Sequence, residues 1–175
     1  MQALERAKDT DFIGREFLVW LWFKTETGGG SFSLGESGLA EFWFDGRIVL
    51  QSDEENDREE KVICLGETSR SREARFALAE HKTITEAKIR LSVGQSEWSF
   101  ILDGIWMNFK SFKTPRVVQD YREDPDGFFY EKFLLIEQAL SAVDAVYAFY
   151  IKLRLSPEWK THELPKLLRW IQEGR

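Results

Sequence analysis

The chain has 175 residues and a formal net charge of −6, with 43% hydrophobic and 31% charged residues. This length suffices for one domain with its own core, and the composition excludes a mainly disordered chain. A single cysteine excludes an internal disulfide and any multi-cysteine zinc site. We therefore expect one domain over residues 1–175 in a cytoplasmic, reducing setting, with no signal peptide and no membrane span.

The N-terminal segment predicts a largely buried helix from about Asp9 to Thr27. Apolar residues cover nearly every side of this helix, and Asp9 or Asp11 is placed to cap its first turn. The run Gly28–Gly30 ends the helix, because glycine readily adopts left-handed backbone conformations. No strand precedes these glycines and no Lys-Ser or Lys-Thr pair follows them, so the run indicates a helix stop rather than a phosphate loop.

Short alternating segments predict an antiparallel meander with one short helix in the middle of the chain. Asp-Gly and Gly-Gln pairs between apolar runs are typical of two-residue hairpin turns. The expected elements are a hairpin about Asp45–Gly46, a strand at Val62–Leu65, a helix at Ser69–His81, a strand at Thr85–Val93, and strands at 98–102 and 105–109 that follow turns at Gly94–Gln95 and Asp103–Gly104. On the last strand, Ile105, Met107 and Phe109 are expected to share one face.

The C-terminal part predicts one long helix, from about Gly127 to Leu155, and one short helix at Leu164–Ile171. Seven apolar residues of the long helix repeat at steps of four and three, which is heptad spacing. They are Phe129, Phe133, Ile136, Leu140, Val143, Tyr147 and Tyr150. We expect most of this helix to lie in the core, and a contact with a second copy or a partner protein is the alternative. The predicted class is α+β.

Catalytic and metal sites are not indicated. Acidic clusters at 53–60 and 120–127 are the only basis for a metal nuclease, and solvated loops explain them better. His81 is placed to cap a helix end, and Cys64 lies in an apolar strand where an inert thiol is expected. The sequence therefore predicts no catalytic residue, no metal and no cofactor.

Positive charge is concentrated in two segments of this acidic chain. Residues 66–90 have a net charge of +2 and residues 107–116 a net charge of +3. These cations are candidates for a surface that contacts nucleic-acid phosphates. They are Arg70, Arg72, Arg75, Lys82, Lys88, Arg90, Lys110 and Lys113. The alternative is a solvated surface of mixed charge, since four glutamates are interleaved with them.

Several segments in succession resemble the C-terminal half of RdgC, the bacterial recombination-associated protein. They are Phe12–Trp22, Val62–Leu65, the helix leading to Lys82, Lys88–Leu91, Trp98–Gly104, Met107–Ser111 and Phe133–Leu140. The resemblance implies a dimeric, nucleoid-associated protein that binds DNA without sequence preference and restrains RecA-dependent recombination. Some RdgC proteins are described as exonucleases, and no residue here supports that activity.

The chain also departs from RdgC in two ways. Nothing in it matches the N-terminal half of that family, and the stretch Leu65–Ser69, which corresponds to the DNA-contacting tip, has no lysine. Arg70 and Arg72 are the nearest cations. Three hypotheses follow: a non-catalytic DNA-binding module, a protein-interaction subunit that pairs through its long helix, and a metal nuclease.

Overall fold

The computed structural model describes residues 13–35, 38–52, 60–66 and 72–173, and it has the α+β class expected from the sequence. Its strands are β1 (Ser31–Ser33), β2 (Leu39–Ser52), β3 (Lys61–Gly66), β4 (Lys82–Val93), β5 (Ser96–Asp103) and β6 (Phe109–Lys113). Its helices are α2 (Arg15–Gly28), α3 (Arg72–Ala79), α4 (Pro125–Arg154) and α5 (Leu164–Gln172), with a π-helical segment at Trp159–Glu163.

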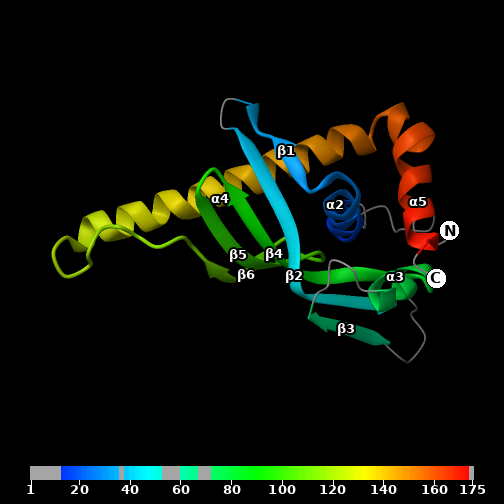
Figure 1. Cartoon of the computed structure of the whole chain (residues 1–175), viewed down its shortest axis with the longest axis horizontal. Coiled ribbons are helices and arrows are strands. Elements are labelled where there is room, and N and C mark those ends of the chain that lie inside the picture. Colours follow the sequence, from blue (N-terminus) through cyan, green and yellow to red (C-terminus); the bar gives the residue numbers. More distant parts are fainter. Residues whose placement is uncertain (1–12, 36–37, 53–59, 67–71, 174–175) are drawn as a thin grey trace.

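The six strands form one antiparallel sheet in the order β1-β2-β4-β5-β6, and β3 pairs with β2 outside this path. Helices α2, α4 and α5 lie on one side of the sheet (Figure 1). The apolar core fills the space between these helices and the sheet. Within the described residues, no helix packs on the opposite face of the sheet, which we call the open face.

Strands β4 and β5 confirm the alternation predicted from the sequence. Ile89 and Leu91 of β4 and Trp98 and Phe100 of β5 are at most 1% exposed and point into the core. The residues between them, Arg90 and Ser99, are partly exposed. A polar-apolar repeat of two residues therefore places one side of each strand in the core and the other on the open face.

The predicted hairpin at Asp45–Gly46 is wrong. Strand β2 runs through these residues without a turn and pairs with β4 along its length. Gly46 does have a positive φ of 75°, but the register with β4 shifts between Phe44 and Ile48, so the glycine lies in a β-bulge. The continuous strand is favoured because it pairs on both edges, with β4 on one side and with β1 and β3 on the other.

The last strand of the meander begins four residues later than predicted. It starts at Phe109, whereas Ile105 lies in the preceding turn with 47% of its surface exposed. Asp103 Oδ1 accepts hydrogen bonds from the backbone N–H groups of Ile105 and Trp106, at 2.8 and 3.1 Å. These two bonds hold the chain in a wider turn than the two-residue turn expected at 103–104.

Helix α2 confirms the prediction of a helix that is buried on nearly every side. Residues 17–23 are 0–5% exposed. The helix ends at Gly28, and Gly29 follows it in the left-handed conformation, as the glycine run indicated. The predicted caps Asp9 and Asp11 lie outside the described residues, and the N-cap is Gly14.

Helix α4 has the predicted length, but its expected burial is wrong for its first half. Asp124 caps it by accepting a hydrogen bond from Gly127 N at 2.9 Å. Beyond Ala139 the helix packs on the core, where Val146 and Tyr150 are buried. Its first turns project past the sheet (Figure 1), and Phe133 there is 64% exposed. Heptad spacing alone could not show where the sheet ends beneath the helix.

Two buried carboxylates connect helices inside the core: Glu16 connects α2 to α4, and Glu163, just before α5, connects that segment to α2. Tyr150 Oη donates a 2.6 Å hydrogen bond to Glu16, and the Arg154 guanidinium forms an ion pair with the same carboxylate. Glu163 accepts a 2.9 Å hydrogen bond from Trp20 Nε1 and pairs with Lys24. Glu16 and Glu163 are 3% and 7% exposed, so both require these polar partners.

The two short helices are close to their predicted positions. The predicted helix 69–81 corresponds to α3, whose preceding residues 69–71 lie outside the described part of the chain. His81 follows it with a φ of 69°, the left-handed conformation common after helix ends. The predicted helix 164–171 corresponds to α5, which has a proline in its first turn.

Candidate nucleic-acid interface

The open face carries most of the polar side chains of the sheet. Register places its outward residues in rows that cross from β2 to β6. The first row consists of Trp43, Arg90, Ser99 and Lys113, which are successive cross-strand partners. We call these four residues the cationic row. It contains two cations, a hydroxyl and an indole, and no carboxylate.

An indole and a guanidinium lie together at one end of the cationic row. The Arg90 guanidinium carbon is 5.5 Å from the centroid of the Trp43 ring, which is within the range of a cation–π contact. Ser99 is the partner of Arg90 on its other side, and Lys113 is the next residue across. Because neighbouring strands are about 4.8 Å apart, the Arg90 and Lys113 backbones are separated by about 10 Å with Ser99 between them.

The rows on either side contain acidic residues. On one side, Glu41, Ser92 and Glu97 are partners in register. On the other side, Lys88 faces Ile101, and Lys88 Nζ is 3.4 Å from Asp45 Oδ2. Both side chains of that ion pair are about 40% exposed, so water screens the interaction and it contributes little to stability.

Lys110 is held more firmly than Lys88. Its ammonium is 2.7 Å from Glu86 Oε1 and 2.8 Å from Asp103 Oδ2, and Glu86 also pairs with Arg47 at 3.2 Å. The chain of alternating charges Arg47–Glu86–Lys110–Asp103 therefore links β2, β4, β5 and β6. A cation that already contacts two carboxylates has little capacity to attract a phosphate.

The pKa values of this charge chain reflect its geometry. The hydrogen bond from Lys110, with the charges of Lys110 and Arg47, lowers the pKa of Glu86 below its usual value. For Asp103, burial opposes ionisation, but hydrogen bonds from Lys110, Trp106 and Ile105 outweigh it and lower the pKa. Hydrogen bonds to Asp103 and Glu86 raise the pKa of Lys110. All three groups are therefore charged at neutral pH.

The remaining predicted cations lie elsewhere. Arg72 is exposed at the start of α3, and the Arg75 guanidinium carbon is 5.9 Å from the Trp170 ring of α5. Lys82 pairs with Glu60 at 3.0 Å, and its side chain is only 12% exposed. Arg70 lies outside the described residues. The structure thus brings four of the eight predicted cations together on the open face, and it leaves Arg72, Arg75 and Lys82 at the α3 end.

The heptad residues of α4 do not form one exposed face. Phe129 and Phe133 are exposed, Ile136, Leu140 and Tyr147 are partly buried, and Val143 and Tyr150 are buried in the core. Leu135 O, on the same helix, accepts a 2.8 Å hydrogen bond from Trp98 Nε1 of β5. A partner could reach the first two heptad residues but not the last ones.

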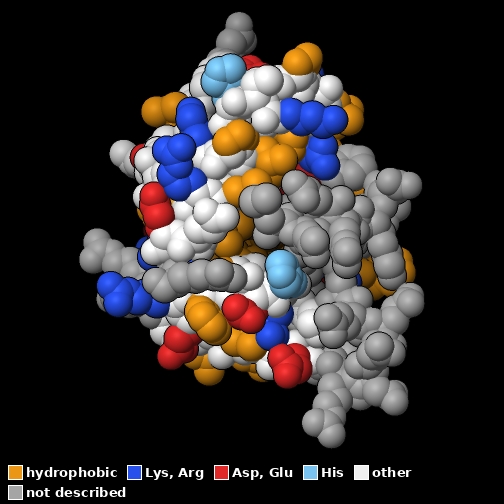
Figure 2. All heavy atoms as spheres, turned by 90° about the vertical axis from the view of Figure 1, so that its right-hand side faces the viewer, with side chains coloured by type: hydrophobic (Ala, Val, Ile, Leu, Met, Phe, Trp, Pro, Cys, Tyr) orange, Lys and Arg blue, Asp and Glu red, His pale blue; other side chains and the backbone are white. Residues whose placement is uncertain are grey.

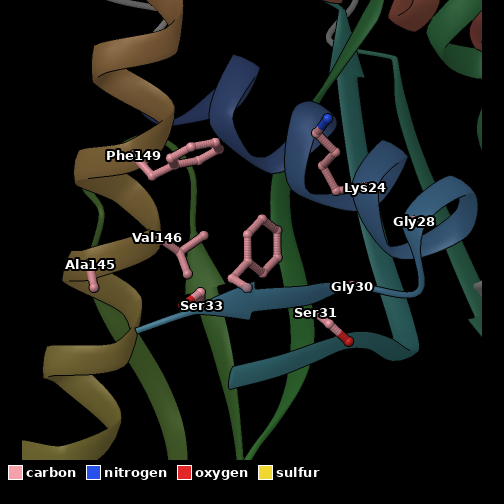
Figure 3. A pocket seen from close by; sticks show the side chains of 9 residues that line it. Lys24, Gly28, Gly30, Ser31, Ser33, Ala145, Val146 and Phe149 are labelled. Carbon is pink, nitrogen blue, oxygen red and sulfur yellow. The ribbon is translucent and has the colours of Figure 1, made fainter. Parts of the chain in front are cut away.

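A pocket of about 370 Å³ lies between the end of α2, β1 and α4 (Figure 3). Phe149 and Val146 of α4 point into it from one side, and Lys24 of α2 lies on the other. The Lys24 ammonium pairs with buried Glu163, so its charge is already neutralised there. Among the described residues, no group of three or more His, Cys, Asp or Glu is placed to hold a metal ion.

Sequence reasoning missed Trp43 and Arg47 as members of the open face. Both lie beside Asp45–Gly46, and the predicted hairpin there separated them from β4. For Trp43, alternation with Phe42 and Phe44 was the available signal, since these two phenylalanines are at most 4% exposed. Arg47 lies within the register shift that follows Phe44, so the alternation does not extend to it. No protein-family model matches the sequence, and no curated protein is significantly similar to it. The resemblance to RdgC therefore stays a prediction.

Proposed function

We propose that the protein is a non-catalytic DNA-binding protein that contacts the phosphate backbone through the open face of its sheet. The cationic row is the observation that carries this proposal. Arg90 and Lys113 flank the Ser99 hydroxyl on adjacent strands, and no carboxylate lies within the row. A phosphate above Ser99 would receive hydrogen bonds from all three side chains, which is the usual way in which proteins hold a nucleic-acid backbone.

Trp43 gives this face a way to contact bases as well as phosphates. Its ring forms one end of the row and is already covered in part by Arg90. Aromatic and guanidinium planes stack on bases irrespective of sequence, and each such contact with a single strand is worth about 1–3 kcal/mol. The row therefore suits binding without sequence preference, as the RdgC resemblance implies. The proposed roles in recombination and at the nucleoid rest on that resemblance alone.

The existing ion pairs decide which other cations of the open face are available to contact a phosphate. Lys88 can exchange its exposed partner Asp45 for a phosphate at little cost, because that pair is solvent-screened. Lys110 cannot do so without giving up its ion pairs with both Glu86 and Asp103. We assign phosphate contacts to Arg90, Lys113 and Lys88, and we assign Lys110 a structural role.

Fluorescence anisotropy with a short duplex and its matching single strand, over a series of salt concentrations, tests this proposal. Lys113→Gln and Lys88→Gln should each lower the slope of log affinity against log salt by about 0.9 for duplex DNA. Lys110→Gln and the exposed control Lys160→Gln should leave this slope unchanged. If Lys113→Gln and Arg90→Gln both bind DNA like the natural protein, the open face is not the interface.

A second candidate function is assembly with another protein chain, which the exposed aromatic residues of α4 favour. Phe129, Tyr130 and Phe133 are 57–67% exposed on the part of the helix that projects past the sheet. Large apolar side chains gathered on a surface mark an interaction site more often than isolated ones do.

A further inference from the structure

The turn between β5 and β6 exposes a tryptophan to solvent. Of the seven tryptophans in the chain, five are at most 5% exposed, and Trp43 is partly buried beside Arg90. Trp106 is 77% exposed, and the neighbouring Ile105 is 47% exposed. Folding therefore gains little from this indole, and tryptophan is among the residues most enriched where proteins bind their partners.

Hydrogen bonds hold this turn in one conformation. Asp103 Oδ1 accepts the backbone N–H groups of Ile105 and Trp106 at 2.8 and 3.1 Å, and Lys110 Nζ holds Asp103 Oδ2 at 2.8 Å. Gly104 N donates a further 2.8 Å hydrogen bond to a carbonyl oxygen of β4. Because the backbone is fixed before a ligand arrives, binding to the Trp106 ring costs little conformational entropy.

The turn lies at one end of the open face. The Asp103 side chain belongs to that face, since Asp103 is the register partner of Glu86, and its two hydrogen bonds place the start of the turn beside it. Ser99 of the cationic row is four residues away along β5, which is about 14 Å. The open face therefore has a ring at two opposite corners, Trp43 on β2 and Trp106 beyond β5.

The path between the two rings crosses the row in which Lys88 and Ile101 are cross-strand partners. Both side chains are partly exposed, and Lys88 has only the solvent-screened pair with Asp45. Beside Trp106, the two carboxylates and two cations of the charge chain balance each other. The middle of the path thus suits a phosphate, whereas its Trp106 end suits an uncharged base.

Two other surfaces lack this combination of rings and cations. The projecting end of α4 exposes Phe129 and Phe133, but residues 120–132 contain five carboxylates and two cations, which disfavour a phosphate backbone. Several Lys and Arg side chains lie in the upper half of Figure 2, which views the end of the molecule that carries α5. The tryptophans of that end, Trp159 and Trp170, are buried and offer no ring to a base.

We propose that the open face selects single-stranded over double-stranded DNA, and that Trp106 and Trp43 hold bases at the two ends of the bound segment. The bases of a duplex are paired and stacked on each other, so their faces are closed to a ring at the protein surface. Each base of a single strand offers such a face. This inference rests on the proposed function, to which it adds the form of DNA and a base contact by Trp106.

Fluorescence anisotropy with a short oligo-dT strand and with a duplex of the same length tests the proposal. Trp106→Ala should weaken single-strand binding about 5- to 150-fold, the range expected when a stacked ring is removed. It should leave duplex affinity and the salt slope unchanged, because the ring carries no charge and touches no phosphate. Trp106→Phe should retain most of the single-strand affinity, since the smaller ring still stacks.

Phe76→Ala is the matched control. Phe76 is also an exposed ring (52%), and it lies one helical turn from Arg72 on α3, outside the open face. It should bind both forms of DNA like the natural protein. If Phe76→Ala weakens single-strand binding and Trp106→Ala does not, the strand follows α3 and the proposal is wrong.

The salt slope separates a failure of this inference from a failure of the proposed function. A natural protein that binds neither form of DNA overturns both. If Lys113→Gln lowers the salt slope but Trp106→Ala binds the single strand like the natural protein, the open face contacts phosphates and the role of Trp106 is wrong. A duplex affinity equal to or above that of the single strand would overturn the selection of single strands.

A strand of the same length that carries no bases tests the stacking contact directly. Trp106→Ala and the natural protein should bind this abasic strand equally, and a difference would show that Trp106 acts through the backbone. Helix α4 is long and apolar enough to cross a membrane, by length and composition only, so a vesicle experiment is also needed. Flotation with phosphatidylcholine vesicles that Trp106→Ala abolishes would show that the turn contacts lipid instead, and would overturn the proposal.

Discussion

Replacing Glu16 by alanine is expected to lower the free energy of unfolding by about 3–4 kcal/mol. Glu16 is 3% exposed and accepts hydrogen bonds from Tyr150 and Arg154. Breaking a buried ion pair by removing one partner costs about 3–5 kcal/mol. The Arg154 side chain is 25% exposed, so water will hydrate its guanidinium in the variant. The loss of unfolding free energy should therefore lie towards the lower end of this range.

The Tyr150 hydroxyl adds a separate contribution. Tyr150→Phe removes only the donor of the 2.6 Å hydrogen bond, and a bond to a charged acceptor is worth about 1.5–3 kcal/mol. The two substitutions share one carboxylate, so their effects will not add in the double variant. For a chain of this size, a loss of 3–4 kcal/mol corresponds to a decrease in melting temperature of about 6–16 °C.

Urea unfolding followed by tryptophan fluorescence measures these losses. Glu97→Ala is the control, because Glu97 is an exposed carboxylate on β5 whose removal should change stability by less than about 0.5 kcal/mol. If Glu16→Ala costs less than about 1 kcal/mol, the buried carboxylate does not join α2 to α4 as argued.

Two further predictions concern the sheet and the start of α2. The pKa values of Glu86 and Asp103 lie below their ordinary 4.5 and 3.8, so their contribution to stability is complete above those values and is lost as the pH falls through the lowered ones. Lys110→Met should therefore flatten the loss of stability between about pH 5 and pH 3, measured by urea unfolding at each pH; an unchanged slope would contradict the assignment. Gly14→Ala places a Cβ 2.1 Å from the Gly104 carbonyl oxygen and should cost about 1–3 kcal/mol in thermal unfolding. Gly28→Ala, where a Cβ meets nothing within 4 Å, should be neutral or stabilising, and equal losses in both variants would refute the steric argument.

The elements that were predicted well are those whose pattern is decided by their own residues. The alternation of β4 and β5 and the apolar run of α2 needed no knowledge of distant partners. Asp45–Gly46 failed for the opposite reason, because the partner that keeps β2 straight is β4, some 40 residues later in the chain. A local turn signal could not reveal the pairing that competes with the turn.

The candidate site depends even more on pairing between distant strands, which local sequence patterns do not reveal. Arg90 and Lys113 were predicted as phosphate contacts. Their position in one row with Trp43 and Ser99 depends on the register of four strands. The sequence also could not show that Lys110 and Lys82 are already paired with carboxylates. For α4, heptad spacing identified the apolar seam, whereas the division of that seam into an exposed and a buried part became visible only in the structure.

The burial of α2 has a consequence for how the protein is made. This deeply buried helix lies near the N-terminus, but several aromatic residues that cover it, such as Tyr150 and Trp170, are near the C-terminus. A ribosome that adds about 5–20 residues per second needs roughly 7–30 s to pass from the helix to Trp170. During that interval the side of the helix that faces α4 and α5 has no native cover, so nascent chains should be bound by chaperones that recognise apolar segments, and chains that terminate before α4 should aggregate.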